Sequence, residues 1–335
     1  MNYFDENDKI YVAGSKGMVG SAICRLLIKK GYQLNKELIT SSRKELDLRD
    51  KMKVDEWFVQ HRPNFVIIAA AKVGGILANK TMPVEFLLDN LKIQNNLIEA
   101  SYKFGVKRLL FLGSSCIYPK YSKQPIKEKY LLTDSLETSN EYYALAKIAG
   151  LKLCEAYRKQ YNFDAITLMP TNLYGPGDNY DLRNSHVMPA MIRKFYEAKK
   201  NNRKEVLCWG TGNPLREFLF VDDLAEACLF AIKNWFPDDN NAPLDDYGKP
   251  LFWLNVGCQY EISIRDLAKK ISKIVKFQGD IIWDKNMPDG TPRKKLDTTQ
   301  INNMGWVAST NLDEGIKKTI KEYEIKENLN LANNI

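Results

Sequence analysis

The sequence predicts an α/β protein in which a parallel β-sheet is covered by helices on both faces. Unbroken apolar runs at 9–14, 65–71 and 108–113 are typical of parallel strands that are buried on both sides of a sheet. Segments with helical periodicity separate these runs, as expected when a crossover helix follows each strand. With 335 residues, 44% of them hydrophobic, the chain is long enough for one large domain or two modest ones.

Composition and charge exclude several functional classes. The formal net charge of +8 is spread over lysine-rich segments such as Lys199–Lys200. No basic stripe is interleaved with stacking aromatics, so we expect no nucleic-acid partner. The longest apolar run is too short to cross a bilayer and residues 1–8 do not resemble a signal peptide, so we expect no membrane association. Six cysteines without Cys-x-x-Cys spacing argue against a metal site or disulfides and favour a cytoplasmic location.

A glycine-rich turn joins the first strand to the first helix. The apolar run 9–14 leads into a G-x-x-G-x-x-G pattern, and helical periodicity continues to Gly31. Small residues in such a turn let backbone N–H groups approach a pyrophosphate at the positive end of the helix. The context predicts a dinucleotide site in a Rossmann-type, doubly wound sheet. The residues expected to line it are Gly14, Lys16, Gly17, Met18, Val19 and Gly20.

The end of the second strand, 38–40, indicates which dinucleotide binds. NAD enzymes usually carry a carboxylate here that holds the ribose 2′-hydroxyl, whereas this chain has Ser41-Ser42-Arg43. A guanidinium at Arg43, together with Lys16, suits a 2′-phosphate, so the predicted cofactor is NADPH. The alternative is that Arg43 is only a surface arginine.

Tyr143 and Lys147 are the first candidates for catalysis. They are four residues apart in a helical pattern that extends to Tyr161, which places both side chains on one face of the helix. A nearby ammonium would favour the ionised form of the phenol, whose ordinary pKa of ~10 makes it sluggish in proton transfer at neutral pH. Taken alone, this spacing is more often a packed aromatic beside a solvated lysine.

The segment Gly113-Ser114-Ser115-Cys116 follows the strand at 108–113. Ligands in a doubly wound sheet bind beyond the carboxyl ends of the strands. The hydroxyls and the thiol of this segment therefore face the same crevice as the glycine turn, and we infer that Tyr143 does too.

The regular alternation loosens after a fifth strand at 165–169. The elements expected beyond it are a helix after 184–189, loops at 209–214, 238–250 and 288–295, strands at 216–221 and 253–257, and helices that begin at 221 and 262.

Four strings carry a closer resemblance. Residues 70–76 (AAKVGGI), 111–119 (FLGSSCIYP), 170–176 (PTNLYGP) and 184–187 (NSHV) resemble the GDP-L-fucose synthases, which are GDP-4-keto-6-deoxymannose 3,5-epimerase/4-reductases of the extended short-chain dehydrogenase/reductase type. The similarity spans about residues 9–305.

The resemblance implies a role for each site residue. Ser114, Tyr143 and Lys147 would reduce the ketone: Tyr143 donates a proton, Ser114 holds the oxygen, and Lys147 tunes the phenol and binds the nicotinamide ribose. Cys116 as base and His186 as acid would invert C3 and C5, although a buried structural cysteine and a packing histidine are the simpler interpretations. Further cofactor contacts are implied for Ala70, Ala71, Lys147, Pro170, Asn172, Leu173 and His186, and substrate contacts for Ser115, Asn172, Lys194, Trp209, Arg216 and Lys294.

The resemblance also implies an organisation. We expect an NADP-binding Rossmann domain at 1–178, completed by about 217–258, and a smaller C-terminal α/β domain at 179–216 and 259–335 that binds the sugar nucleotide. In this superfamily the helices at 83–104 and 142–161 pair across a two-fold axis, so a homodimer is expected.

Three alternatives stay open at this stage. The chain could be a C4 reductase of a GDP-4-keto-heptose for surface polysaccharide, with the epimerisation done by another protein. It could be a nucleotide-sensing binding protein without turnover, which Ser114, Tyr143 and Lys147 argue against. It could be an NAD-retaining epimerase or dehydratase, which Arg43 and the pair Cys116 and His186 disfavour.

Overall fold

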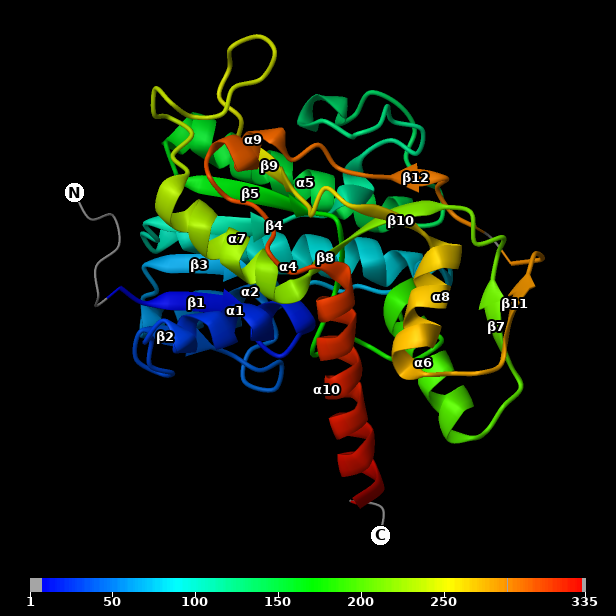
Figure 1. Cartoon of the computed structure of the whole chain (residues 1–335). Helices are drawn as coiled ribbons and strands as arrows, with labels where there is room; N and C mark the ends of the chain where they lie inside the picture. Colours follow the sequence, from blue (N-terminus) through cyan, green and yellow to red (C-terminus); the bar gives the residue numbers. More distant parts are fainter. Residues whose placement is uncertain (1–7, 288, 333–335) are drawn as a thin grey trace.

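The structure is a computed structural model that describes residues 8–287 and 289–332. Its centre is a six-stranded parallel sheet with the strand order β2-β1-β3-β4-β5-β9 (Figure 1). The predicted α/β class with a parallel central sheet is therefore confirmed. The strands are β1 (Ile10–Ala13), β2 (Leu38–Thr40), β3 (Phe65–Ile68), β4 (Arg108–Leu112), β5 (Ala165–Pro170) and β9 (Trp253–Val256).

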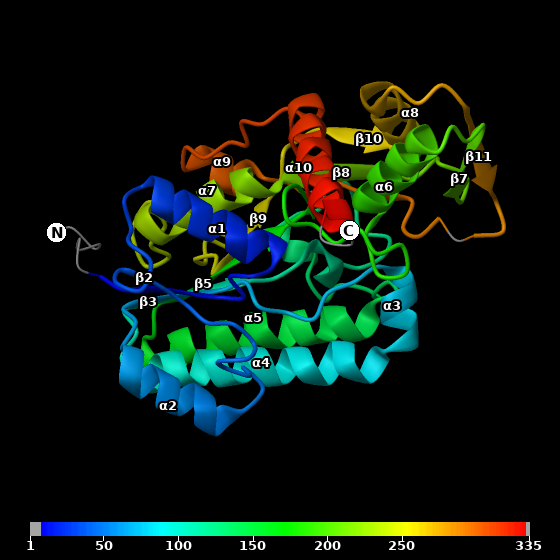
Figure 2. The ribbon, with the colours of Figure 1, turned by 90° about the horizontal axis from the view of Figure 1, so that it is seen from below.

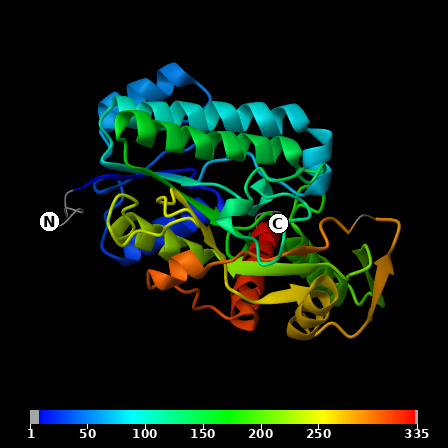
Figure 3. The same ribbon diagram turned by 90° about the horizontal axis from the view of Figure 1, so that it is seen from above.

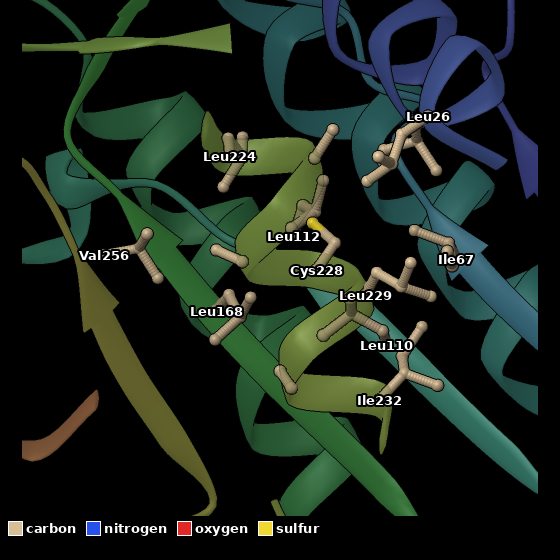
Figure 4. Close-up of a cluster of buried hydrophobic side chains, with 14 of the residues drawn as sticks. Leu26, Ile67, Leu110, Leu112, Leu168, Leu224, Cys228, Leu229, Ile232 and Val256 are labelled. Atoms are coloured by element: carbon tan, nitrogen blue, oxygen red, sulfur yellow. The ribbon is translucent and has the colours of Figure 1, made fainter. Parts of the chain in front are cut away.

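Helices cover both faces of this sheet (Figures 2 and 3). On one face lie α1 (Met18–Lys29) and α7 (Val221–Asn234), and on the other α2 (Lys51–His61), α4 (Pro83–Lys103) and α5 (Glu141–Tyr161). Apolar side chains fill the space between the sheet and each helical layer. Figure 4 shows Leu112 of β4 beside Cys228 of α7, and Leu110 beside Leu229 and Ile232, in the first core.

A second group of elements has a core of its own. At its centre β8 (Leu215–Phe220) pairs with β6 (Asn172–Tyr174), β10 (Glu261–Ser263) and β12 (Arg293–Lys294). The other members are β7 (Glu205–Trp209), β11 (Asp280–Asp284), α6 (Val187–Lys200), α8 (Ile264–Val275) and α10 (Leu312–Ala332). The short helices α3 (Ile76–Thr81) and α9 (Thr299–Asn303), and the 3₁₀ turns η1 (Ser115–Ile117) and η2 (Glu128–Tyr130), complete the described elements.

Several boundaries differ from the sequence expectations. The helix expected to begin at 262 begins at Ile264, because Glu261–Ser263 pair with β8 as strand β10. The strand expected at 65–71 ends at Ile68, because its neighbour β1 ends at Ala13 and the chain then enters the glycine turn. Trp209, expected in a loop, is the last residue of β7, where it pairs with Asp284. The segment expected as a loop at 288–295 contains the two-residue strand β12. The expectations for residues 1–7 and 288 lie outside the described residues.

Within the described ranges, no helix is both long and apolar enough to cross a membrane.

Candidate active site

The candidate catalytic side chains meet where β4 ends and α5 begins. Ser114 precedes the turn η1, and its Oγ accepts a hydrogen bond from the Cys116 backbone N–H at 3.2 Å. The Tyr143 hydroxyl is hydrogen-bonded to the same Ser114. Lys147 lies one helical turn further, with its Nζ 5.8 Å from the centre of the Tyr143 ring. The local spacing on α5 and the end of β4 therefore place the three predicted reduction residues together.

Lys147 is buried and its ammonium is held by the end of β4. Its Nζ donates to the Leu112 carbonyl oxygen at 2.8 Å and lies 4.7 Å from the centre of the Phe111 ring. Desolvation by burial lowers the pKa of Lys147 to about 7. The amine therefore exchanges its proton near neutral pH.

The pKa of Tyr143 moves opposite to the sequence expectation. Burial raises it, the nearby Cys116 raises it further, and the hydrogen bond with Ser114 only partly offsets these effects. Lys147 does not lower it, because an amine with a pKa of about 7 has already lost its charge at the higher pH where the phenol ionises. Tyr143 is thus protonated at neutral pH, which suits a proton donor.

Two nitrogen donors converge on the Cys116 sulfur. Asn140 Nδ2 lies 3.3 Å and Lys294 Nζ 3.4 Å from the Cys116 Sγ. Burial alone would raise the pKa of Cys116, but the Lys294 charge and hydrogen bonds from Ser114, Lys294 and Asn140 outweigh it, and the pKa is lowered. A low thiol pKa beside a cation is typical of a reactive cysteine.

His186 is the residue directly before α6, and part of it is exposed to solvent while the surrounding protein desolvates its ring. Desolvation, and secondarily the Lys294 charge, lower its pKa. A close approach of two loops fixes the segment before it: the Gly75 N–H donates to the Asn184 carbonyl at 2.9 Å, and a Cβ at Gly75 would lie 2.5 Å from the Ser185 carbonyl oxygen. Only glycine fits at position 75 without displacing the loop that carries His186.

The glycine turn has the features that a dinucleotide requires. Gly14 has a φ of +88°, and a Cβ there would lie 2.7 Å from the Ala70 backbone. At the start of α1, Gly17 leaves the first N–H groups without a side-chain cap. The Ser15 Oγ is buried with no hydrogen-bond partner among the described residues. Uncapped donors at a helix N-terminus suit a pyrophosphate, so the residues present fit this group.

The other predicted cofactor residues lie at the same edge of the sheet or close to it. Lys16 and Arg43 are exposed beyond β1 and β2. Glu45, which the sequence analysis did not consider, accepts a hydrogen bond from the Ser42 N–H at 2.7 Å. Ala71 follows β3, Pro170 ends β5, and Leu173 packs against the main core. Asn172 uses its amide to donate to the Glu217 carbonyl at 2.8 Å.

The predicted substrate residues form two groups. Arg216 and Lys294 face each other across the register of β8 and β12, and Ser115 is buried in η1 beside Cys116. Further out, Lys194 Nζ donates to the Leu207 carbonyl at 2.8 Å and lies 5.5 Å from the centre of the exposed Trp209 ring. The structure thus gives Lys294 a sulfur contact that the sequence analysis did not anticipate.

Asp289 connects the loop that follows Trp209 with the loop beside Arg216. Its carboxylate accepts hydrogen bonds from the Thr211 N–H at 2.7 Å and the Thr211 Oγ1 at 2.8 Å. A Cβ at the adjacent Gly290 would lie 3.4 Å from an Arg216 nitrogen, so the 289–290 loop passes over Arg216. The sequence analysis did not identify Asp289 or Asn140 as site residues. For Asn140, its position directly before a predicted helix was the available signal.

Comparisons with known proteins identify the family of this chain. Residues 10–242 match a family described as the NAD dependent epimerase/dehydratase family. GDP-L-fucose synthase 1 of Arabidopsis thaliana is 50% identical over 319 residues, covering 95% of this chain and 94% of the relative. GDP-L-fucose synthase of Escherichia coli K12 is 46% identical over 94% of this chain and 96% of the relative.

Among solved structures, the GDP-mannoheptose C4 reductase of Campylobacter jejuni with NADP bound has a TM-score of 0.85 at 34% identity, and the match covers 96% of this chain and 99% of that one. The chain therefore belongs to the NAD dependent epimerase/dehydratase family and, within it, to the GDP-L-fucose synthase family. The resemblance inferred from the sequence is confirmed.

Proposed function

We propose that the protein is an NADPH-dependent enzyme that reduces the C4 ketone of a GDP-4-keto-6-deoxy sugar and epimerises C3 and C5 in the same site. The observation that carries this proposal is the convergence of Ser114 and Tyr143 with Cys116, whose sulfur contacts Lys294. The residues proposed for the reduction, Ser114 and Tyr143, thus lie beside Cys116, a base with a lowered pKa.

The reduction uses the residues around the end of β4. The glycine turn, Lys16 and Arg43 would hold the cofactor, which when bound supplies a hydride to the ketone carbon. Tyr143 donates its proton to the ketone oxygen as negative charge develops there, and Ser114 holds that oxygen by a hydrogen bond. Lys147, with its pKa of about 7, replaces the proton that the phenol gives up.

The epimerisation uses the acidity of protons next to a ketone, since the resulting carbanion delocalises into the carbonyl. The Cys116 thiolate removes such a proton from one face of the sugar, and the His186 imidazolium delivers one to the other face. Arg216 would bind the diphosphate and Trp209 would stack on a ring. Ser115, Asn172, Lys194 and Lys294 are proposed as further contacts of the sugar nucleotide.

The test follows both reactions with GDP-4-keto-6-deoxymannose and NADPH in D₂O. We expect NADPH oxidation together with deuterium at C3 and C5 of the product. Tyr143→Phe should lower NADPH oxidation by ~100-fold or more, and Cys116→Ser should remove deuterium uptake while proton donation by Tyr143 stays possible. Reduction without any deuterium uptake by the wild type would refute the epimerase, and an unchanged rate in Tyr143→Phe would refute the catalytic assignment.

A GDP-4-keto-heptose is the second candidate substrate, because the structural relative named above is a GDP-mannoheptose C4 reductase. The higher identity to fucose synthases favours the hexose. A panel of GDP-linked 4-keto hexoses and heptoses, compared by kcat/KM for NADPH oxidation, discriminates between them.

We also propose a homodimer that forms through α4 and α5. These helices pack side by side and expose apolar side chains: Val84 and Leu88 on α4, and Tyr142 and Leu145 on α5 are 43–66% exposed. A paired apolar surface on adjacent helices is typical of a subunit interface. The free cysteines favour a reducing compartment such as the cytoplasm.

The two hydrophobic cores support the proposed division into domains. The core around the parallel sheet would belong to the NADP-binding domain at 1–178, completed by 217–258. The second core would belong to the sugar-nucleotide domain at 179–216 and 259–335, and Tyr174, Phe218 and Phe220, which the proposed ranges give to the first domain, pack in it as well.

A further inference from the structure

The Cys116 sulfur has the surroundings of an anion. Two N–H groups, from Asn140 and Lys294, point at it from 3.3 and 3.4 Å. A neutral thiol is a weak donor and a weak acceptor, whereas a thiolate is an acceptor only and satisfies both N–H groups. Asn140 precedes α5 but does not cap it with its side chain, so its amide is free to serve the sulfur.

The charges around Cys116 leave Lys294 as its counter-ion. A small pocket beside the thiol is lined by Lys120, Glu137 and Arg293, but these charges are neutralised elsewhere. The Glu137 carboxylate lies 3.0 Å from Lys120, and Arg293 pairs with Glu261 at 2.6 Å.

The remaining groups that face the Cys116 sulfur do not supply a counter-ion in place of Lys294. The Arg216 guanidinium on β8 interacts electrostatically with Cys116, but its Nη1 donates a hydrogen bond to the Leu215 carbonyl at 2.9 Å. Tyr143 on α5 also interacts electrostatically with Cys116, but its phenol is protonated and carries no charge. Lys294 forms no ion pair with any carboxylate among residues 8–287 and 289–332, so its ammonium is available to the sulfur.

The fold holds the Lys294 backbone on both sides. Lys294 pairs with Arg216 in the register of β12 and β8. Directly after it, the Lys295 N–H donates to Gln124 Oε1 at 2.9 Å and the Leu296 N–H to Glu217 Oε2 at 3.0 Å.

Glu217 makes that attachment rigid. It is fully buried, and its other carboxylate oxygen accepts the N–H groups of Cys258 at 2.8 Å and Gln259 at 2.9 Å. The position of the Lys294 ammonium over Cys116 is thus built into the frame of the second sheet.

We infer that Lys294 is a positioning residue that keeps Cys116 in its thiolate form, with Asn140 as the second donor. This role differs from the substrate contact that the resemblance implies for Lys294. The inference rests on the proposed epimerase function, in which Cys116 is the base, but the contact is testable on the protein without substrate.

The test measures alkylation of Cys116 by iodoacetamide as a function of pH, with the modified peptide quantified by mass spectrometry. Iodoacetamide is neutral, so its rate reports the thiolate fraction and not attraction of the reagent. We expect Lys294→Gln to slow alkylation at pH 7 by ~10-fold or more and to move the pH profile upward, because an adjacent opposite charge favours the ionised form. Lys294→Arg, which keeps the charge, should restore much of the rate.

Lys295→Gln is the matched control, because it removes the same charge one residue further along the chain and should leave the rate unchanged. Cys24 and Cys258 serve as internal references, since burial raises the pKa of each to about 11. Asn140→Asp provides a second variant that leaves Lys294 in place: an added carboxylate beside the sulfur should slow alkylation as well. Equal rates for wild type and a folded Lys294→Gln would overturn the inference.

The outcomes separate this inference from the proposed function. A Lys294-dependent thiolate without deuterium uptake at C3 and C5 supports the inference and refutes the epimerase. Deuterium uptake together with alkylation that is independent of Lys294 supports the epimerase and overturns the inference.

Discussion

Replacing Lys147 with methionine should stabilise the protein at neutral pH while it removes the reductase activity. Lys147 is 3% exposed, and burial lowers its pKa from 10.5 to about 7. At ~1.36 kcal/mol for each pKa unit, holding this amine in the folded state costs about 4 kcal/mol at pH 7. Methionine avoids that cost but leaves the Leu112 carbonyl without its donor, a loss of ~1–3 kcal/mol. We therefore expect a net gain of ~2 kcal/mol.

The pH dependence gives the sharper test. Because the pKa is lower in the folded state, the unfolded state binds more protons between pH 7 and 10.5, and wild-type stability rises with pH in that window. The advantage of Lys147→Met should therefore shrink by ~1.4 kcal/mol for each pH unit above 7.

Denaturant unfolding of the cofactor-free protein at pH 7, 8 and 9 measures this advantage directly. Lys159→Met, an exposed position on the same helix, is the control and should change stability by less than ~0.5 kcal/mol. A clear destabilisation by Lys147→Met at pH 7, or an advantage that does not change with pH, would refute the reasoning.

Four further predictions follow from the site and the proposed interface. Gly75→Ala should lower deuterium uptake more than NADPH oxidation, because its Cβ would collide with the Ser185 carbonyl at 2.5 Å. Lys294→Gln should move the pH optimum of deuterium uptake upward, since the Lys294 charge lowers the pKa of both the base and the acid. Arg43→Ala should raise KM for NADPH by ~10-fold or more while KM for NADH stays similar. Leu145→Lys should convert a dimer into monomers in light scattering, because it places a charge in an exposed apolar helix face.

Each of these has a result that contradicts it. Equal losses of both reactions in Gly75→Ala would mean that the clash disturbs more than the acid. An unmoved pH optimum in Lys294→Gln would remove that lysine as the source of both pKa changes. A parallel rise of both KM values in Arg43→Ala would argue against a 2′-phosphate contact. Ile282→Lys, on β11 and similarly exposed, should keep the oligomeric state of the wild type; loss of the dimer there too would mean that Leu145 is not specific.

The elements around the parallel sheet were predictable because their signals are local. Apolar runs indicated β1, β3, β4 and β5, and the glycines after β1 indicated the turn into α1. The four-residue spacing of Tyr143 and Lys147 was sufficient to place them on one helix face. The second group of elements was predicted less completely: β7 and β11 are short and half-exposed, so their patterns did not stand out from loops.

The sequence alone determined the class of fold, the location of the dinucleotide turn and the identities of the residues at the end of β4. These features depend on backbone geometry within a few neighbouring residues, which hydrophobic periodicity and glycine spacing encode. Only the tertiary structure decided that Lys294 reaches the sulfur of Cys116 across 178 positions of chain, and that the pKa of Tyr143 rises when a nearby lysine suggested the opposite. Distances between remote side chains, and the loss of water around them, arise only when the sheets and helices pack.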